Sequence, residues 1–134
     1  MNALTQVPVV GFDLVECDEV REALDAFGQS YLDRIYLPAE IAYAEASPSQ
    51  RVERLAARFA AKEAVFKALQ WPAESPRSFR DIEIVRGASG SCTVRLHGEV
   101  RVRAEATHFS VCSISLTHVR HTAGAVVLAT VTQA

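Results

Sequence analysis

The order of the sequence patterns predicts an α+β fold. A stretch near the N-terminus, Val7 to Glu16, is rich in β-branched residues that alternate with period two, as in a strand. Helical patterns follow and end in one long helix, and period-two alternation returns from Asp81 onward. We therefore expect one N-terminal strand, a helical block with one long helix, and then a mainly antiparallel sheet.

Length and composition are those of an ordinary globular domain. The 134 residues suffice for one core, so we assign residues 1–134 to a single domain. No apolar run is long enough to span a membrane and no signal-peptide pattern opens the chain, so we expect a cytoplasmic protein that does not bind membranes. The three cysteines lack CxxC spacing and are expected to be free thiols.

Charge is distributed unevenly along the chain. Residues 1–46 carry nine of the 16 acidic residues but only two of the 14 Lys and Arg residues, so the remainder of the chain is basic. This basic portion is suited to an anionic ligand or partner. Nucleic acid is disfavoured, because no basic run is interleaved with aromatic residues and the net charge is −2.

The first strand carries an acidic residue on its apolar face. Period two puts Val7, Val9, Gly11, Asp13 and Val15 on one side. Gly11 leaves room there for another backbone or a ligand to approach closely. Asp13 is either a site residue or simply the end of the strand and a cap for the next helix.

Three short helical segments are expected next. The first should be capped by Asp18 and closed by Gly28. Proline at the first position favours the start of the third. The predicted ranges are Asp18 to Phe27, Ser30 to Ile35 and Pro38 to Ala44.

The long helix is predicted from Ser47 to Leu69, with Ser47 as N-cap, Gln50 completing a capping box, and Pro72 stopping it. Its inward face gathers the apolar residues Val52, Leu55, Ala56, Phe59, Ala60 and Phe66. Glu63 lies within this face, where a carboxylate loses solvation unless a partner compensates. Either Glu63 pairs with Lys67 one turn on, or it belongs to a functional site.

Period-two patterns return in the last third of the chain. We expect a hairpin, a short helix or irregular crossing, and two further strands. The ranges are Asp81 to Val85, Cys92 to Gly98, Glu99 to Thr107, Phe109 to Leu116 and Thr122 to Val131. The core should bury Val9, Leu14, Leu55, Phe59, Phe66, Ile82, Ile84, Leu96, Ile114 and Val127.

One ion would explain both acidic residues on apolar faces. Mg²⁺ takes oxygen ligands, often from only one or two carboxylates, and completes its shell with water and phosphate. Asp13 and Glu63 would make such a half-site if they meet. Arg58, Lys62 and Lys67 lie on the same helix as Glu63 and suit a phosphate-bearing substrate.

Three motifs resemble those of the 4′-phosphopantetheinyl transferase superfamily. They are GFDLVE (Gly11 to Glu16), LAARFAAKEAVFKAL (Leu55 to Leu69) and SLTH (Ser115 to His118). Their order and spacing, with the chain length, resemble the stand-alone holo-acyl-carrier-protein synthase type from Gly11 to Val127. The resemblance implies the α+β fold of that family and a homotrimer with active sites at the subunit interfaces.

The resemblance also implies a reaction. The phosphopantetheine arm of coenzyme A would be transferred to a serine of an apo acyl carrier protein from fatty acid, polyketide or peptide synthesis, releasing adenosine 3′,5′-bisphosphate. By similarity, Asp13 and Glu63 would ligate Mg²⁺, and Asp13, Glu63 and Lys67 would form the catalytic set. The coenzyme A would be held by Arg58, Lys62, Lys67, Ser115 and His118.

The proton acceptor for the attacking serine stays open. Glu63, or a metal-bound water that it orients, is the first hypothesis, and His118 is its rival. A lone His at a strand end is also commonly a hydrogen-bonding or phosphate contact.

Two features depart from the family pattern. Gln70, Trp71 and Pro72 replace a glycine-rich turn, which leaves any contact of this loop with coenzyme A in doubt. The segment CDEVREALDAFG is acidic where the family's carrier-docking helix tends to be basic, so an acidic carrier would be repelled. Either another surface docks the carrier, with Arg34, Arg51 and Arg54 as candidates, or the carrier is less acidic; Arg51 and Arg54 are equally consistent with a solvated helix face. These departures keep an alternative open, a non-catalytic coenzyme A or carrier-binding module.

Overall fold

A computed structural model describes residues 4–133 and has the expected α+β architecture. Its strands within this range form a three-stranded antiparallel sheet in the order β1-β5-β4 and a two-stranded antiparallel sheet, β2-β3. Their bounds are β1 Thr5–Glu16, β2 Ile82–Arg86, β3 Cys92–Leu96, β4 Ser110–His118 and β5 Thr122–Gln133. The N-terminal strand therefore forms one edge of the sheet that the last two strands complete.

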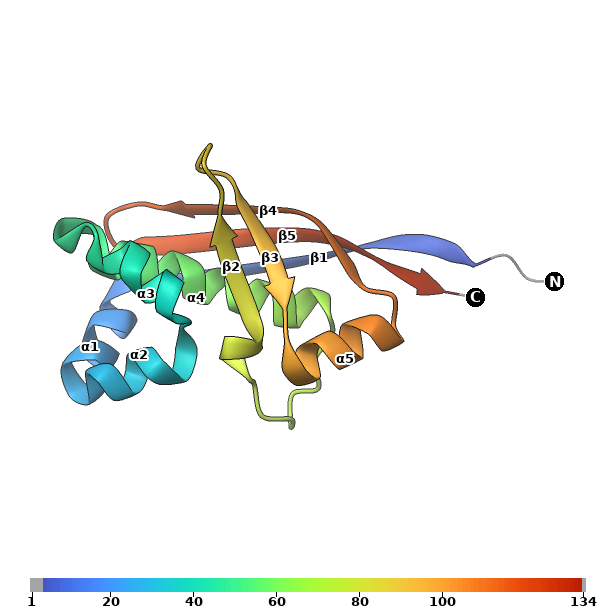
Figure 1. The fold of residues 1–134 in the computed structure, drawn as a ribbon, viewed down its shortest axis with the longest axis horizontal. Coiled ribbons are helices and arrows are strands. Elements are labelled where there is room, and N and C mark those ends of the chain that lie inside the picture. The colour runs from blue at the N-terminus through green and yellow to red at the C-terminus, as the bar shows by residue number, and fades with distance from the viewer. Residues whose placement is uncertain (1–3, 134) are drawn as a thin grey trace.

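The helices lie between β1 and β2 in the sequence, except for one that follows the hairpin. Figure 1 shows α4 running along the three-stranded sheet, the β2-β3 hairpin crossing in front of it, and α1 to α3 gathered near one end. Their bounds are α1 Cys17–Phe27, α2 Gln29–Ile35, α3 Pro38–Glu45, α4 Arg51–Ala68 and α5 Gly98–Ala106. The segment after β3 is thus a regular helix. No helix within residues 4–133 has the length and apolar character needed to cross a membrane.

The two predicted caps are wrong. Asp18 lies inside α1, because the Cys17 N–H donates to the His121 carbonyl at 2.9 Å and the helix starts directly from the strand. Ser47 makes no side-chain cap and the capping box with Gln50 does not form. A 3₁₀ turn, Pro48–Gln50, precedes α4 instead, and the Ser47 carbonyl accepts from the Gln50 N–H at 2.9 Å.

The core is built around α4, whose small residues let the sheet approach closely. Ala60, Ala61 and Ala64 are fully buried. A Cβ added to Gly11 on β1 would lie 1.8 Å from the Ala64 carbonyl oxygen, so only glycine permits this contact. The expectation that another backbone approaches Gly11 is therefore confirmed. This close contact also sets the distance between α4 and Asp13, two residues further along β1.

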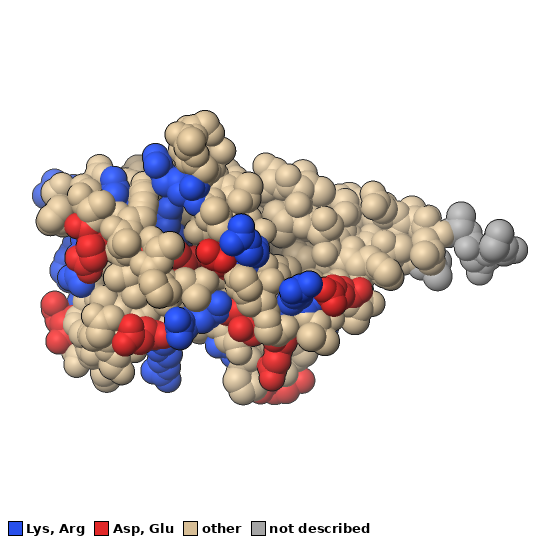
Figure 2. All heavy atoms as spheres, in the orientation of Figure 1, with Lys and Arg blue, Asp and Glu red and all other residues tan. Residues whose placement is uncertain are grey.

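Most predicted core residues are buried or pack against the core, but Leu14 is wrong. Leu14 is 61% exposed, because it points away from the side of β1 that carries Gly11 and Asp13. It belongs to an exposed apolar sheet face formed by Val10, Phe12, Leu14, Val126 and Leu128. In Figure 2 the charged side chains gather over the helices and the hairpin, and the far ends of the sheet strands are bare of charge.

Candidate active site

The end of α4 is tied to β1 by Lys67. Its Nζ donates to Asp13 Oδ1 at 2.9 Å and to the Phe12 carbonyl at 3.0 Å. The Asp13 side chain is 17% exposed, whereas that of Lys67 is 50% exposed. A carboxylate from the strand and an ammonium from the helix therefore meet at the edge of the sheet, with the ammonium still open to solvent.

Glu63 lies one turn before Lys67 but does not pair with it. Its carboxylate instead receives Arg77 Nη1 at 3.0 and 3.3 Å, and only 8% of the residue is exposed. Of the two alternatives for Glu63, the pair with Lys67 is therefore wrong, because Lys67 binds Asp13 and Arg77 binds the glutamate. Both acidic residues have a cationic partner, each from a different segment.

Sequence reasoning missed Arg77, which the loop after α4 brings to the site. Gln70 adopts a φ of 56°, a left-handed conformation that turns the chain back where the family pattern has glycine. The Trp71 indole then donates to the Pro76 carbonyl at 3.1 Å and packs edge-on against Phe66. The sequence did contain a signal for Arg77. A buried carboxylate on α4 requires a cationic partner, and Arg77 directly follows Pro76 in the loop after this helix.

The two carboxylates influence each other electrostatically. Burial raises the pKa of Glu63, the Arg77 guanidinium opposes this rise, and the neighbouring Asp13 carboxylate adds to it. The charge of Asp13 on β1 therefore acts on the protonation of Glu63 on α4. A cation close to both would stabilise the charged form of Glu63 against burial, and it would offset the repulsion between the two carboxylates.

The donor set suits a hard divalent cation. Within residues 4–133, no group of three or more His, Cys, Asp or Glu side chains is arranged to hold a metal ion. Mg²⁺ does not need such a group, because it commonly uses one or two carboxylates and takes its other oxygens from water and phosphate. Asp13 and Glu63 can supply two carboxylates of this kind, and a nearby cation would offset the repulsion by which Asp13 raises the pKa of Glu63.

Ser115 and His118 do not join this site within one chain. Ser115 pairs with Val126, which pairs with Phe12, so Ser115 lies on the exposed apolar sheet face, opposite Asp13. His118 is exposed on the side that carries Asp13, but it lies two strands away, a separation of about 10 Å across the sheet. The structure therefore separates both residues from the carboxylates.

Arg58 lines a pocket on another side of α4. The Arg54 and Arg58 guanidiniums lie 4.0 and 4.1 Å from the centre of the Tyr43 ring, and that of Arg86 lies 5.0 Å from it. These arginines and Tyr43 line a hollow of about 450 Å³, which we call the arginine pocket. Arg58 is 5% exposed and its Nε is buried without a hydrogen-bond partner among the described residues. The lining also includes the carboxylates of Glu40, which is paired with Lys62, and Glu83, which is paired with Arg95 and His97. Because both carboxylates have partners, the three guanidiniums favour an anion in the hollow.

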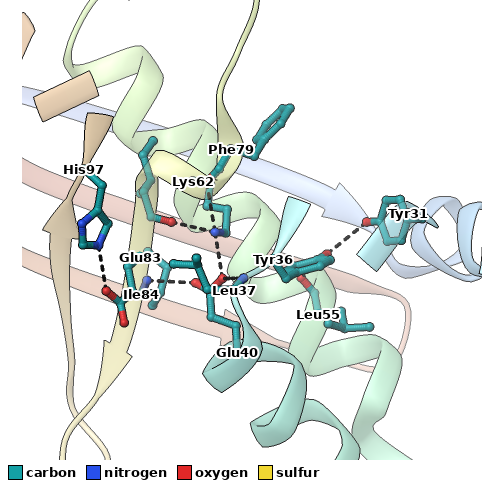
Figure 3. Close-up of polar contacts among 11 residues, drawn as sticks. Tyr31, Tyr36, Leu37, Glu40, Leu55, Lys62, Phe79, Glu83, Ile84 and His97 are labelled. Carbon is teal, nitrogen blue, oxygen red and sulfur yellow. Dashed lines mark hydrogen bonds and ion pairs between the residues drawn. The ribbon is translucent and has the colours of Figure 1, made fainter. Parts of the chain in front are cut away.

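Lys62, which the sequence resemblance places near the phosphates of coenzyme A, has a fully buried side chain. Its Nζ is fully buried and contacts the Glu40 carboxylate at 2.9 Å, the Phe79 carbonyl at 3.1 Å and the Ile82 carbonyl at 2.6 Å (Figure 3). Burial lowers the pKa of Lys62, and the charge of Glu40 opposes that change. All three ammonium donors are used inside the protein, so Lys62 has none left for coenzyme A.

The proposed docking arginines differ in their availability. Arg51 is paired with Glu45 at 2.9 Å, and Arg54 is turned onto Tyr43 and donates to its carbonyl at 2.7 Å. Arg34 is exposed. On α1, Arg21 is bound to Asp18, so the acidic character of this helix is not offset by a free cation of its own.

Comparisons with known proteins identify the family. A family model described as the 4′-phosphopantetheinyl transferase superfamily matches residues 9–127. A holo-(acyl-carrier-protein) synthase of Solidesulfovibrio magneticus is 41% identical over 119 residues, which cover 89% of this chain and 94% of that protein. A protein of the same description from Chloroflexus aggregans is 40% identical over 129 residues and covers 89% and 92%.

Solved structures agree with this result. An ACPS–CoA complex of Chronobacterium ammoniagenes superposes with a TM-score of 0.81 at 29% identity and covers 95% of this chain and 99% of that one. The fold, the three motifs and the match over most of the length thus point the same way. The chain belongs to the 4′-phosphopantetheinyl transferase superfamily.

Proposed function

We propose that this protein is a holo-acyl-carrier-protein synthase, which transfers the 4′-phosphopantetheine of coenzyme A to a serine of an apo acyl carrier protein and releases adenosine 3′,5′-bisphosphate. The observation that supports the proposal is that Lys67 on α4 binds Asp13 of β1 at 2.9 Å, one helical turn after Glu63, which binds Arg77 and whose pKa the Asp13 carboxylate raises. Phosphoryl transfer depends mostly on positioning and on neutralising charge, and this arrangement can supply both.

Asp13 and Glu63 would hold Mg²⁺, which supplies charge neutralisation at the diphosphate of coenzyme A. Lys67 is held by Asp13 and stays half exposed, so it can direct a donor at a phosphate oxygen without moving far. Arg77, with a 38% exposed side chain, can do the same from its place beside Glu63. Both cations would exchange part of their bonding to the carboxylates for bonding to the substrate.

Glu63, or a metal-bound water that it orients, is our candidate for the proton acceptor. Burial of Glu63 raises its pKa towards the working range, which favours acceptance of a proton from the carrier serine at neutral pH. His118 is the rival, and its exposed position at the end of β4 is open to a partner or substrate. The pH dependence of turnover in Glu63→Gln separates them, because the acidic limb should disappear only if Glu63 is the base.

The arginine pocket would bind the nucleotide end of coenzyme A. Arg58, Arg54 and Arg86 provide guanidinium forks that suit a phosphate monoester, and Tyr43 provides an aromatic surface. On α4, Arg58 and Glu63 are five residues apart and point about 140° apart. One chain would therefore present the pocket and the carboxylates on different sides.

We further propose a homotrimer with its active sites between subunits. The exposed apolar sheet face includes Phe12 at 55% and Leu14 at 61% exposure, and contiguous exposed apolar side chains are typical of a protein–protein interface. Ser115 lies on the same face, and assembly through it would bury these residues. Contacts between copies would also bring one chain's pocket towards another chain's carboxylates.

We also propose a cytoplasmic location, for which the cysteines are the evidence. The three cysteines are unpaired, which supports a reducing compartment, the cytoplasm, where disulfides rarely persist. The carrier would come from fatty acid, polyketide or peptide synthesis. The acidic surface of α1 favours a carrier less acidic than usual, or docking that involves Arg34.

An intact-mass assay tests the function. The protein is incubated with coenzyme A, Mg²⁺ and a panel of apo carrier proteins, and one carrier should gain a single phosphopantetheine. Asp13→Asn and Glu63→Gln should each lower the transfer rate to a small residual value, whereas Glu45→Gln, a change in an exposed ion pair, should retain full activity. Coenzyme A binding without transfer to any carrier would instead indicate a non-catalytic binding module.

A further inference from the structure

Glu40 is a buried acidic residue that the proposed reaction does not use. It lies on α3, is 2% exposed, and has both carboxylate oxygens bonded. Oε1 accepts from the Leu37 N–H at 2.8 Å and contacts Lys62 Nζ at 2.9 Å, and Oε2 accepts from the Ile84 N–H at 2.9 Å (Figure 3). One side chain therefore joins the start of α3, the middle of α4 and the centre of β2.

Lys62 extends the same connection. Beyond Glu40, it bonds to the carbonyls of Phe79 and Ile82, at the 3₁₀ turn Phe79–Asp81 and the first residue of β2. The hairpin strand is thus held to α4 through the lysine and to α3 through the glutamate. Water cannot compete for these hydrogen bonds, because the side chain of Lys62 is 0% exposed and that of Glu40 is 1% exposed.

The three joined elements are those that carry the arginine pocket. Tyr43 is three residues after Glu40 on α3, and Arg58 is four residues before Lys62 on α4, spacings that put each pair on one helix face. Arg86 is two residues after Ile84 on β2, on the same side of the strand. Glu40 and Lys62 are thus each one helical turn from a pocket residue, and Ile84, whose N–H binds Glu40, is two residues from another.

We propose that Glu40 and Lys62 are positioning residues, which fix the spacing of Tyr43, Arg58 and Arg86 and thereby set the affinity of the arginine pocket for the phosphate of a nucleotide. The nucleotide part of this claim rests on the proposed function. Lys62 does not line the pocket, and Glu40, at its wall, is only 2% exposed and has both carboxylate oxygens bonded to protein groups. The pair holds α3, α4 and β2 at the separation at which the guanidiniums converge on the tyrosine ring.

A double variant separates positioning from stability. Removing one member of a buried ion pair leaves an unpaired charge, but replacing both by neutral residues of similar size is often neutral for stability. Glu40→Gln with Lys62→Met removes both charges. It also loosens β2, because Lys62→Met removes the bonds to the Phe79 and Ile82 carbonyls. An amide has only one acceptor oxygen, so Glu40→Gln can keep only one of the bonds from the Leu37 and Ile84 N–H groups.

Tyr36→Phe is the matched control. Tyr36 is fully buried beside the same network, and its hydroxyl donates to the Leu55 carbonyl at 3.0 Å. This change also removes buried hydrogen bonding, but it leaves the connection between α3, α4 and β2 in place. It should lower stability without altering the pocket.

Two readouts are measured on variants that thermal unfolding shows to be folded. Titration calorimetry with adenosine 3′,5′-bisphosphate should show about a tenfold loss of affinity in the double variant and none in Tyr36→Phe. In transfer assays, KM for coenzyme A should rise by a similar factor while kcat changes little. Unchanged affinity in the folded double variant would overturn the proposal.

A readout that needs no ligand keeps the test independent of the proposed function. The side-chain N–H signals of Arg54 and Arg58 should be shifted in NMR spectra by the Tyr43 ring, which lies 4.0 and 4.1 Å away. The double variant should lose these shifts while its core methyl signals persist. Shifts that persist would refute the positioning role, whereas their loss in a protein with no nucleotide affinity would refute only the nucleotide assignment.

Discussion

Gly11→Ala should destabilise the protein more than any surface substitution. The added Cβ would lie 1.8 Å from the Ala64 carbonyl oxygen, 2.7 Å from its carbon and 3.0 Å from the Ala68 nitrogen. All three are helix backbone atoms that cannot rotate away, so β1 and α4 must separate by about 1 Å or more. Overpacking of this kind typically costs 1–3 kcal/mol, and we expect about 3 kcal/mol because backbone must move.

The measurement is urea and thermal unfolding followed by circular dichroism. For a chain of this size, about 3 kcal/mol corresponds to a fall in Tm of about 10 °C. Gly87→Ala is the control, because its nearest neighbour, the Ser91 carbonyl oxygen, lies at 3.5 Å, and it should stay within about 0.5 kcal/mol of the wild type. A Gly11→Ala variant as stable as that control would refute the close packing of β1 on α4.

Three further predictions follow from the site and its surroundings. Arg77→Ala leaves Glu63 buried without its cation, so the pKa of Glu63 should rise further and the acidic limb of the pH–rate profile should move to higher pH; an unmoved limb would argue against the pair. Phe12→Asp puts a charge on the exposed apolar sheet face and should convert a trimer to smaller species in light scattering; an unchanged mass would place the interface elsewhere. Cys17 is 1% exposed and burial raises the pKa of its thiol, so iodoacetamide should modify it only after unfolding in urea; equally fast labelling of the native protein would contradict this.

Local patterns predicted the elements well, because each depends on residues close in sequence. The period-two stretch of β1 and the long apolar face of α4 were both recognised, with ends within a few residues. The caps predicted at Asp18 and Ser47 were both wrong, and for Asp18 the reason is a contact that is distant in sequence. The Cys17 N–H finds a carbonyl at His121, over 100 residues away, and no local rule can indicate such a partner.

Part of the site was predictable and part was not. Asp13 and Glu63 were selected as candidates because a carboxylate on an apolar face loses solvation and therefore calls for an explanation. Arg77 was missed, since its approach depends on the folded shape of the loop behind α4. Lys62 was assigned to phosphate from its place in the motif, but its partner Glu40 comes from another helix and holds it inside. Ser115 lies across the sheet from Asp13, which only the strand register reveals.

The most direct test of the account is whether Asp13 and Glu63 act on one metal ion. Mn²⁺ would be titrated into the protein with coenzyme A present, and its binding followed by electron paramagnetic resonance for the wild type, Asp13→Asn, Glu63→Gln and the double variant. We expect each single change to remove most of the affinity and the double change to add little, because both residues serve the same ion. Two independent losses that simply add, or wild-type binding in either single variant, would contradict a shared site.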